Sequence, residues 1–192
     1  SPHKTVDPFY LCGHVIMALN AIVSRRVDPT SPAVVSIGSL NGGFTENVIP
    51  DHVDITGTLR YIEENVHKEL HEEIRRSFEL ARALGGDYEL RIELGDPPMV
   101  NDPKAVKLIE SAAAKLIGAE NIQPMEKGLG AEDFGRFSVL APGAMFSLGA
   151  KITGDERTGH NPHFDIDENC LPIGTAILVE SALDYLRQGK SG

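Results

Sequence analysis

The chain has 192 residues, of which 41% are hydrophobic and 24% charged, a balance typical of a folded globular protein. Its 28 acidic residues outnumber its 18 basic ones, and the formal net charge is −10. Because no basic stripe is present, neither nucleic acid nor an anionic membrane surface is an expected partner. No apolar run approaches the roughly 20 residues of a membrane span. The two cysteines, Cys12 and Cys170, form no disulfide framework or zinc-ribbon spacing and fit a reducing cytoplasm.

The first half of the chain predicts helices and strands in a mixed order. Asp7-Pro8 is typical of a capped helix start, and apolar residues at helical spacing follow it. Alternation of apolar and polar residues predicts the strands, and a wider apolar period predicts the helices. The expected order is helix, strand, strand, helix, strand, over residues 8–26, 33–40, 53–61, 66–84 and 88–94. This is the order of a split βαβ, ferredoxin-like sandwich that lacks its first strand.

The second half of the chain predicts helices separated by a short strand, which indicates an α/β segment. Asp102-Pro103 repeats the capped-helix start, and Gly118 ends that helix. Met145–Leu148 is a short apolar run bounded by glycines and predicts a strand. Residues 170–186 predict a final helix. We expect a boundary between two domains near residues 96–102, where Pro97-Pro98 marks a connector.

Several candidate motifs have ordinary explanations. His67 and His71 are four residues apart on a helix, but Lys68 stands where a zinc-peptidase helix needs glutamate, so a solvated surface pair is expected. Gly128-Leu129-Gly130 is too short for a dinucleotide or phosphate loop. The residue counts would allow a Ser-His-Asp hydrolase, but the sequence disfavours it, because no Gly-x-Ser-x-Gly elbow exists. Cys12 lies on an apolar helical stripe, and packing accounts for it.

Three polar segments are not explained so simply. One is the glycine-rich loop 42–51, another is the acidic turn 130–134, and the third is the stretch 160–168, which holds two histidines and several acids. A histidine beside Asn-Pro in a loop, as at His160, is a candidate for metal binding or acid–base work.

Together these segments resemble the co-catalytic metallopeptidase and amidohydrolase family, which includes aminoacylases and hippurate hydrolases. The similarity is strongest to the hippurate-hydrolase and N-acyl-amino-acid amidohydrolase branch. It covers nearly the whole chain in order and spacing. The motifs that carry it are Ser1-Pro2-His3, Val6-Asp7-Pro8, Gly42-Gly43, Asn47-Val48-Ile49-Pro50-Asp51, Gly57-Thr58-Leu59-Arg60, Ala131-Glu132-Asp133-Phe134, His160-Asn161-Pro162 and Phe164-Asp165.

The resemblance implies a domain organisation. Members have a catalytic domain with two divalent metal ions and an inserted ferredoxin-like lid that usually dimerises. Residues 1–98 would then be the lid without its first strand, and residues 99–192 the C-terminal segment of the metal-binding catalytic domain. The metal could be zinc, manganese, cobalt or nickel. The expected partners are a small N-acyl amino acid or peptide substrate and a second copy of the chain.

The resemblance also implies roles for individual residues. His160 matches the final metal ligand of the family. Asn47 and Arg60 match lid residues that hold the substrate, and thirteen positions separate them, which could bring both side chains over one substrate. Glu132, Asp133 and His3 match the surroundings of the site, and Glu132 is a weaker candidate for a metal ligand.

The family's remaining motifs, including the glutamate that serves as general base, have no counterpart in these residues. We therefore expect an incomplete C-terminal portion of a metal-dependent amidohydrolase, inactive by itself. The alternative is a non-catalytic dimerisation or binding module.

Overall fold

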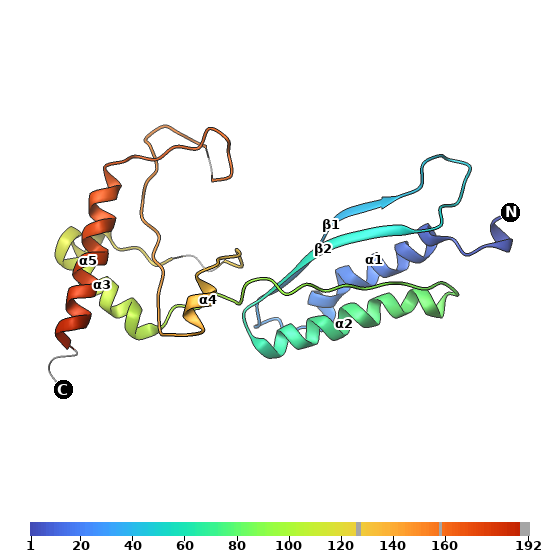
Figure 1. Ribbon diagram of the computed structural model, residues 1–192, viewed down its shortest axis with the longest axis horizontal. Helices are drawn as coiled ribbons and strands as arrows, with labels where there is room; N and C mark the ends of the chain where they lie inside the picture. Colours follow the sequence, from blue (N-terminus) through green and yellow to red (C-terminus); the bar gives the residue numbers. More distant parts are fainter. Residues whose placement is uncertain (126–127, 158, 189–192) are drawn as a thin grey trace. The chain divides into compact units, whose positions relative to one another are not determined.

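The computed structural model of the chain describes residues 1–125, 128–157 and 159–188, and these form two compact units. Unit 1 comprises Ser1–Met99 and Gly128–Asp133, and unit 2 comprises Val100–Lys127 and Phe134–Gly192. Figure 1 gives the labels of the helices and strands. Among the described residues, no helix is long and apolar enough to cross a membrane.

The helices of unit 1 begin and end close to where the sequence predicts. A short 3-10 turn, η1 (Pro2–Lys4), precedes α1 (Pro8–Arg25). The Phe9 N–H donates to Asp7 Oδ1 at 2.9 Å, so the predicted cap is confirmed. The second long helix, α2 (Glu64–Ala83), ends just before the Gly85-Gly86 pair.

The sheet of unit 1 is a two-stranded antiparallel hairpin. β1 (Ala33–Gly42) pairs with β2 (Val53–Tyr61), in a register that sets Ala33 opposite Tyr61. The register shifts between Ile37 and Ser39, where the ladder contains a bulge. A Cβ atom at Gly57 would lie 2.4 Å from the Ser36 carbonyl oxygen, so glycine is required for the close approach of the strands there.

The core of unit 1 lies between the hairpin and the two long helices. Figure 1 shows α1 and α2 side by side along one face of the hairpin, and both helices contact the strands. Cys12 is buried on α1, as packing predicts. The buried apolar residues of this core are Leu11, Val15, Leu19, Ile22, Val27, Val66, Leu70, Ile74 and Ala81.

The strand predicted at residues 88–94 does not form. The segment has the predicted alternation of burial, and Tyr88, Leu90 and Ile92 pack against the core. A strand also requires a hydrogen-bonded neighbour, and the described residues supply none for this segment. The apolar pattern therefore correctly predicts which side chains face inward, but not the ladder.

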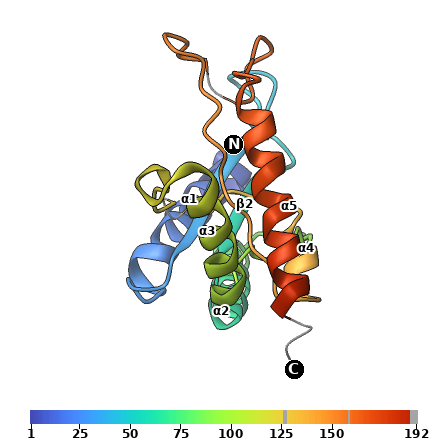
Figure 2. The ribbon, with the colours of Figure 1, turned by 90° about the vertical axis from the view of Figure 1, so that its left-hand side faces the viewer.

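Unit 2 consists of helices joined by long coil segments. Figures 1 and 2 show its two longest helices, α3 and α5, side by side, and Lys115 Nζ on α3 lies 2.6 Å from Asp184 Oδ2 on α5. Asp102 caps α3 through the Lys104 N–H at 2.9 Å, as predicted. The elements are α3 (Pro103–Ile117), η2 (Ala119–Asn121), α4 (Gly135–Ser138) and α5 (Cys170–Gln188).

The strand predicted at Met145–Leu148 is also wrong, and the described part of unit 2 contains no strand, so its predicted α/β character is not observed. The backbone N–H and carbonyl of Met145 instead form hydrogen bonds with the side chain of Asn101. Its N–H donates to Asn101 Oδ1 at 2.8 Å, and its carbonyl accepts from Asn101 Nδ2 at 2.9 Å. An amide side chain thus makes the pair of hydrogen bonds that a neighbouring strand would otherwise provide.

Candidate functional site

Unit 1 contains a cavity of about 610 Å³ beside β2. Both strands and both long helices contribute to its lining, together with the coil segments 90–99 and 129–132. The lining includes the apolar residues Leu19, Ile74 and Phe78 together with polar and charged side chains. A concave, mostly apolar site with a few polar groups is the usual form of a small-ligand site.

Arg60 lines this cavity near the end of β2. The residue is half-buried, and its Nη1 donates to the Leu129 carbonyl oxygen at 2.7 Å. That hydrogen bond holds the guanidinium beside the Leu129 carbonyl, at the lining of the cavity. A guanidinium held in this way can grip a carboxylate through two parallel hydrogen bonds.

Glu132 lines the same cavity as Arg60, although the two residues are far apart in the sequence. The segment Gly128–Asp133 belongs to unit 1. The structure thus brings together two of the residues that sequence reasoning singles out. Asp133 follows directly in the chain but is not part of the cavity lining.

The prediction of a solvated surface pair for His67 and His71 is wrong. The His67 side chain is only 14% exposed and stacks on Tyr61, with ring centroids 4.2 Å apart and planes 9° apart. The rings of His71 and His67 form a T-shaped pair with centroids 4.3 Å apart, and both histidines line the cavity. Their positions share a helix face with Ile74 and Phe78, and that spacing was the signal that could have identified them as inward-facing.

Two nitrogen atoms of this histidine pair are buried without a hydrogen bond: His67 Nδ1 and His71 Nε2. The nearest carboxylate oxygen to His67 Nδ1, Glu64 Oε1, lies 3.5 Å away. Burial lowers the pKa of His71 below its ordinary value of 6.5, and the neighbouring His67 and Arg75 lower it further. The neutral imidazole is therefore favoured at this position.

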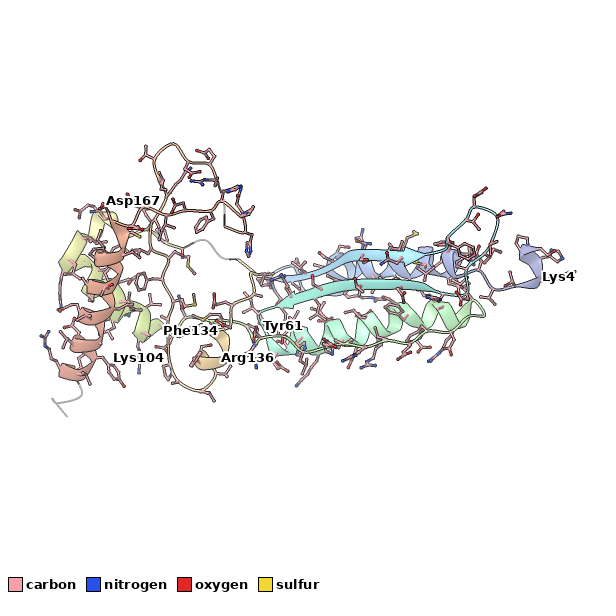
Figure 3. All side chains as sticks on the ribbon, turned by 45° about the horizontal axis from the view of Figure 1, so that its top comes forward. Lys4, Tyr61, Lys104, Phe134, Arg136 and Asp167 are labelled. Carbon is pink, nitrogen blue, oxygen red and sulfur yellow. The ribbon has the colours of Figure 1, made fainter. Side chains whose placement is uncertain are left out.

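Asn47 and His3 lie away from Arg60. Asn47 is exposed in the loop between the strands, and its Oδ1 accepts a hydrogen bond from the Thr45 hydroxyl at 3.2 Å. The stretch of β2 from Val53 to Arg60 is about 23 Å long at roughly 3.3 Å per residue. In Figure 3, Lys4, the neighbour of His3, and Tyr61, the neighbour of Arg60, are labelled at opposite ends of unit 1. Within one chain, Asn47 and Arg60 are therefore not brought over one substrate as expected.

His160 lies in an exposed loop of unit 2. Its φ angle of 67° is left-handed, which is uncommon for a residue other than glycine and is often associated with functional positions. Arg157 stabilises this loop, because its guanidinium forms an ion pair with Asp155 and donates a hydrogen bond to the His163 carbonyl. The paired guanidinium lowers the pKa of Asp155 to about 2.

The residues present do not by themselves make a two-metal centre. Within residues 1–125, 128–157 and 159–188, no group of three histidine, cysteine, aspartate or glutamate side chains gathers closely enough to hold an ion. The imidazole of His160 is chemically suited to bind a divalent transition metal, but a metal ion needs further ligands.

Comparisons with known proteins identify relatives over nearly the whole chain. The family model "Peptidase family M20/M25/M40" matches residues 7–184. A thermostable carboxypeptidase of Saccharolobus solfataricus is 32% identical over 91% of this chain and 44% of its own length. An N-acetyl-L-cysteine deacetylase of Bacillus subtilis is 34% identical over 94% of this chain and 42% of its own length.

A solved structure agrees with this similarity. The crystal structure of a dinuclear metal-binding peptidase of the M20 family from Bacillus subtilis superposes with a TM-score of 0.71 at 25% identity. The match covers 95% of this chain and 47% of that protein. The mixture of helices with a small antiparallel sheet is thus shared with a metallopeptidase of known structure. The chain spans about half the length of the relatives it matches.

Proposed function

Because the chain belongs to peptidase family M20/M25/M40, we propose that the whole protein is a metal-dependent hydrolase that cleaves the amide bond of N-acyl amino acids or small peptides. Unit 1 would contain the lid, a ferredoxin-like sandwich lacking its first strand, within residues 1–98. Residues 99–192 would form the C-terminal segment of the catalytic domain. The relatives, which are about twice as long, include a carboxypeptidase and a deacetylase, both of which act on amide bonds.

The observation that carries the substrate class is the position of Arg60. Its guanidinium is anchored to the Leu129 carbonyl and lines a cavity that can admit a small molecule. An N-acyl amino acid, like the C-terminal end of a peptide, carries a carboxylate that this guanidinium would bind. Glu132 would line the same site, and Asp133 would support the loop that carries it.

His160 would bind one of two divalent metal ions in the whole protein, where ligands from the rest of the polypeptide would complete the centre. The support is its imidazole, its exposed left-handed loop position and the dinuclear metal site named for the Bacillus subtilis relative. Zinc, manganese, cobalt and nickel all suit an imidazole ligand. Because Asn47 lies away from Arg60 within one chain, its amide would contribute to substrate binding in a homodimer, and His3 would line the surroundings of the site.

A binding or dimerisation role is favoured by the outer edge of β1. Among the described residues this edge has no strand beside it, and Leu40 and Phe44 near one end of the strand are exposed. An unpaired strand edge can form backbone hydrogen bonds with a second copy of the chain. The lid would therefore form a homodimer, with or without the catalytic activity. The cytoplasm is the compartment that the cysteine content favours.

Hydrolysis of N-acetyl and N-benzoyl amino acids by the whole protein, supplied in turn with each of the four metals, tests the proposal. Release of the free amino acid, and much weaker release from the corresponding carboxamides, is the expected result. Absence of hydrolysis with every metal and every acyl group would overturn it.

A further inference from the structure

Two histidines of α2 line the cavity beside β2 from successive turns of the helix. His67 and His71 are four residues apart, so their side chains lie one above the other on the same face of α2. Each has one buried ring nitrogen without a hydrogen-bond partner, Nδ1 of His67 and Nε2 of His71. Buried polar atoms without partners are uncommon in folded proteins. The pair therefore presents two imidazole nitrogens that a ligand can satisfy.

The chemistry of the pair suits a metal ion. Burial and the neighbouring charges lower the pKa of His71, so its ring is neutral near pH 7 and keeps a nitrogen lone pair. Neutral imidazole is the commonest protein ligand of divalent transition metals. Histidines at positions i and i+4 of one helix can direct both nitrogens at a single ion, as helical zinc sites do.

The distance within the pair is close to that of two rings on one zinc ion. Zinc binds an imidazole nitrogen at about 2.0–2.1 Å, so two rings on one tetrahedral ion have centroids about 5 Å apart. The centroids of His67 and His71 are 4.3 Å apart, with ring planes 79° apart. A shift of less than about 1 Å would thus let both rings reach one ion, and the cavity that both line offers the space.

Glu64 supplies a carboxylate one turn before His67. Its Oε1 lies 3.5 Å from His67 Nδ1, and two ligands of one tetrahedral zinc ion are about 3.4 Å apart. The three side chains do not converge on one point as they stand in the described part of the chain. The Glu64 side chain is 69% exposed, however, so it can turn toward the histidines without disturbing the core. A Glu-x-x-His pair on one helix binds metal ions in helical bundles.

We propose that Glu64, His67 and His71 form a binding site for one divalent transition-metal ion such as zinc. The two unpaired imidazole nitrogens bind the ion, the carboxylate is the third ligand, and water completes the coordination. Lys68 stands where zinc-peptidase helices have their general-base glutamate, so the ion has a structural role and connects the first turns of α2. This inference rests on the geometry of unit 1 and does not depend on the proposed hydrolase activity.

Calorimetric titration of the 192-residue chain with zinc chloride at about pH 7.5, where imidazole is neutral, tests the proposal. Every sample carries His160→Ala, so that zinc bound by that exposed imidazole is not counted. We expect one ion per chain with a Kd on the order of 10 μM. In the chain labelled with ¹⁵N-histidine, NMR signals of the ring nitrogens of His67 and His71 should shift as zinc is added. The urea midpoint should rise with zinc concentration, because the ion binds the folded chain.

Three variants locate the ion. His71→Gln should weaken zinc binding at least about tenfold, since loss of even an outer partner of a metal ligand costs that much. Glu64→Gln should weaken it by a smaller factor. The matched control is His14→Gln, which removes an exposed histidine from α1 and should leave the affinity unchanged. Urea titration of each metal-free variant establishes that it folds, and the NMR measurement on the chain with both histidines does not depend on any of the three.

Four results would overturn the proposal. These are no saturable zinc binding, ring signals of His67 and His71 that do not move, equal affinity in His71→Gln and His14→Gln, and an affinity that is unchanged in Glu64→Gln.

Discussion

Tyr61 lies flat against His67, with ring centroids 4.2 Å apart, where β2 ends and α2 is about to begin. The contact joins the last residue of the strand to the first turn of the helix. The contact covers one face of the imidazole, and the His71 ring packs nearly perpendicular to the same imidazole. The end of the hairpin is thereby fixed to α2 beside Arg60, the residue on which the proposed substrate binding depends.

Acid should destabilise unit 1 through His71. Its pKa in the folded chain is below 6.5, because burial, His67 and Arg75 all disfavour the charged form and Glu64 opposes them only in part. The unfolded chain therefore binds more protons than the folded chain as the pH falls below about 6.5, and stability decreases over that range. Above that pH the full stability is present. His71→Gln should flatten the dependence of the urea midpoint on pH between 7 and 5, and a variant with the same slope as the parent chain would contradict the prediction.

Gly57→Ala should destabilise the hairpin. The new Cβ would lie 2.4 Å from the Ser36 carbonyl oxygen, so β1 and β2 would have to separate locally. A loss of about 1–3 kcal/mol in the free energy of unfolding is expected, as for other overpacked sites. Gly13→Ala is the matched control, because a Cβ there meets nothing within 4 Å in the middle of α1. The control should be neutral or slightly stabilising, and equal losses for both variants in urea titrations would refute the steric explanation.

Arg60→Ala should reduce kcat/KM of the whole protein by about 10- to 100-fold for substrates with a free carboxylate. The reason is the loss of a charge-assisted hydrogen bond, worth about 1.5–3 kcal/mol. Arg60→Lys should restore only part of the activity, because an ammonium cannot form the two parallel bonds of a guanidinium. The same assays on carboxamide substrates provide the control. If Arg60→Ala weakens both substrate classes equally, Arg60 does not bind the carboxylate.

The 192-residue chain by itself should hydrolyse no N-acyl amino acid. In its described part no three candidate ligands gather, and a two-metal site needs several. His160→Ala should accordingly leave the thermal midpoint unchanged in the presence of zinc. The measurement is amino-acid release over hours, with calorimetric titration of zinc alongside. Metal-dependent hydrolysis that disappears in His160→Ala would show that the chain holds a complete site.

The sequence predicted the elements that depend on local rules and missed those that depend on distant ones. The caps at Asp7 and Asp102 and the alternation in β2 are local, and the structure has them where expected. The segment 88–94 has the pattern of a strand but not the neighbour, and periodicity cannot supply a neighbour.

The candidate site, like the fold, can be predicted from the sequence only where local patterns determine it. Arg60 could be placed on the polar face of its strand, but its contact with Leu129 crosses 69 positions and has no local signal. The spacing of His67 and His71 relative to Ile74 and Phe78 is a local signal that they face inward, but the cover that Tyr61 provides for His67 comes from another element and has no local signal. Residue type indicated the chemistry, whereas tertiary packing determined which residues meet.

The hydrogen bond from Arg60 to Leu129 also determines how the chain can be divided. The backbone leaves unit 1 after Met99, returns for Gly128–Asp133, and leaves again. A gene fragment that stops at Met99 would encode both strands and both long helices of unit 1 but not the carbonyl that anchors the guanidinium. Such a fragment could reproduce the fold of unit 1 and still misrepresent how its arginine binds a ligand.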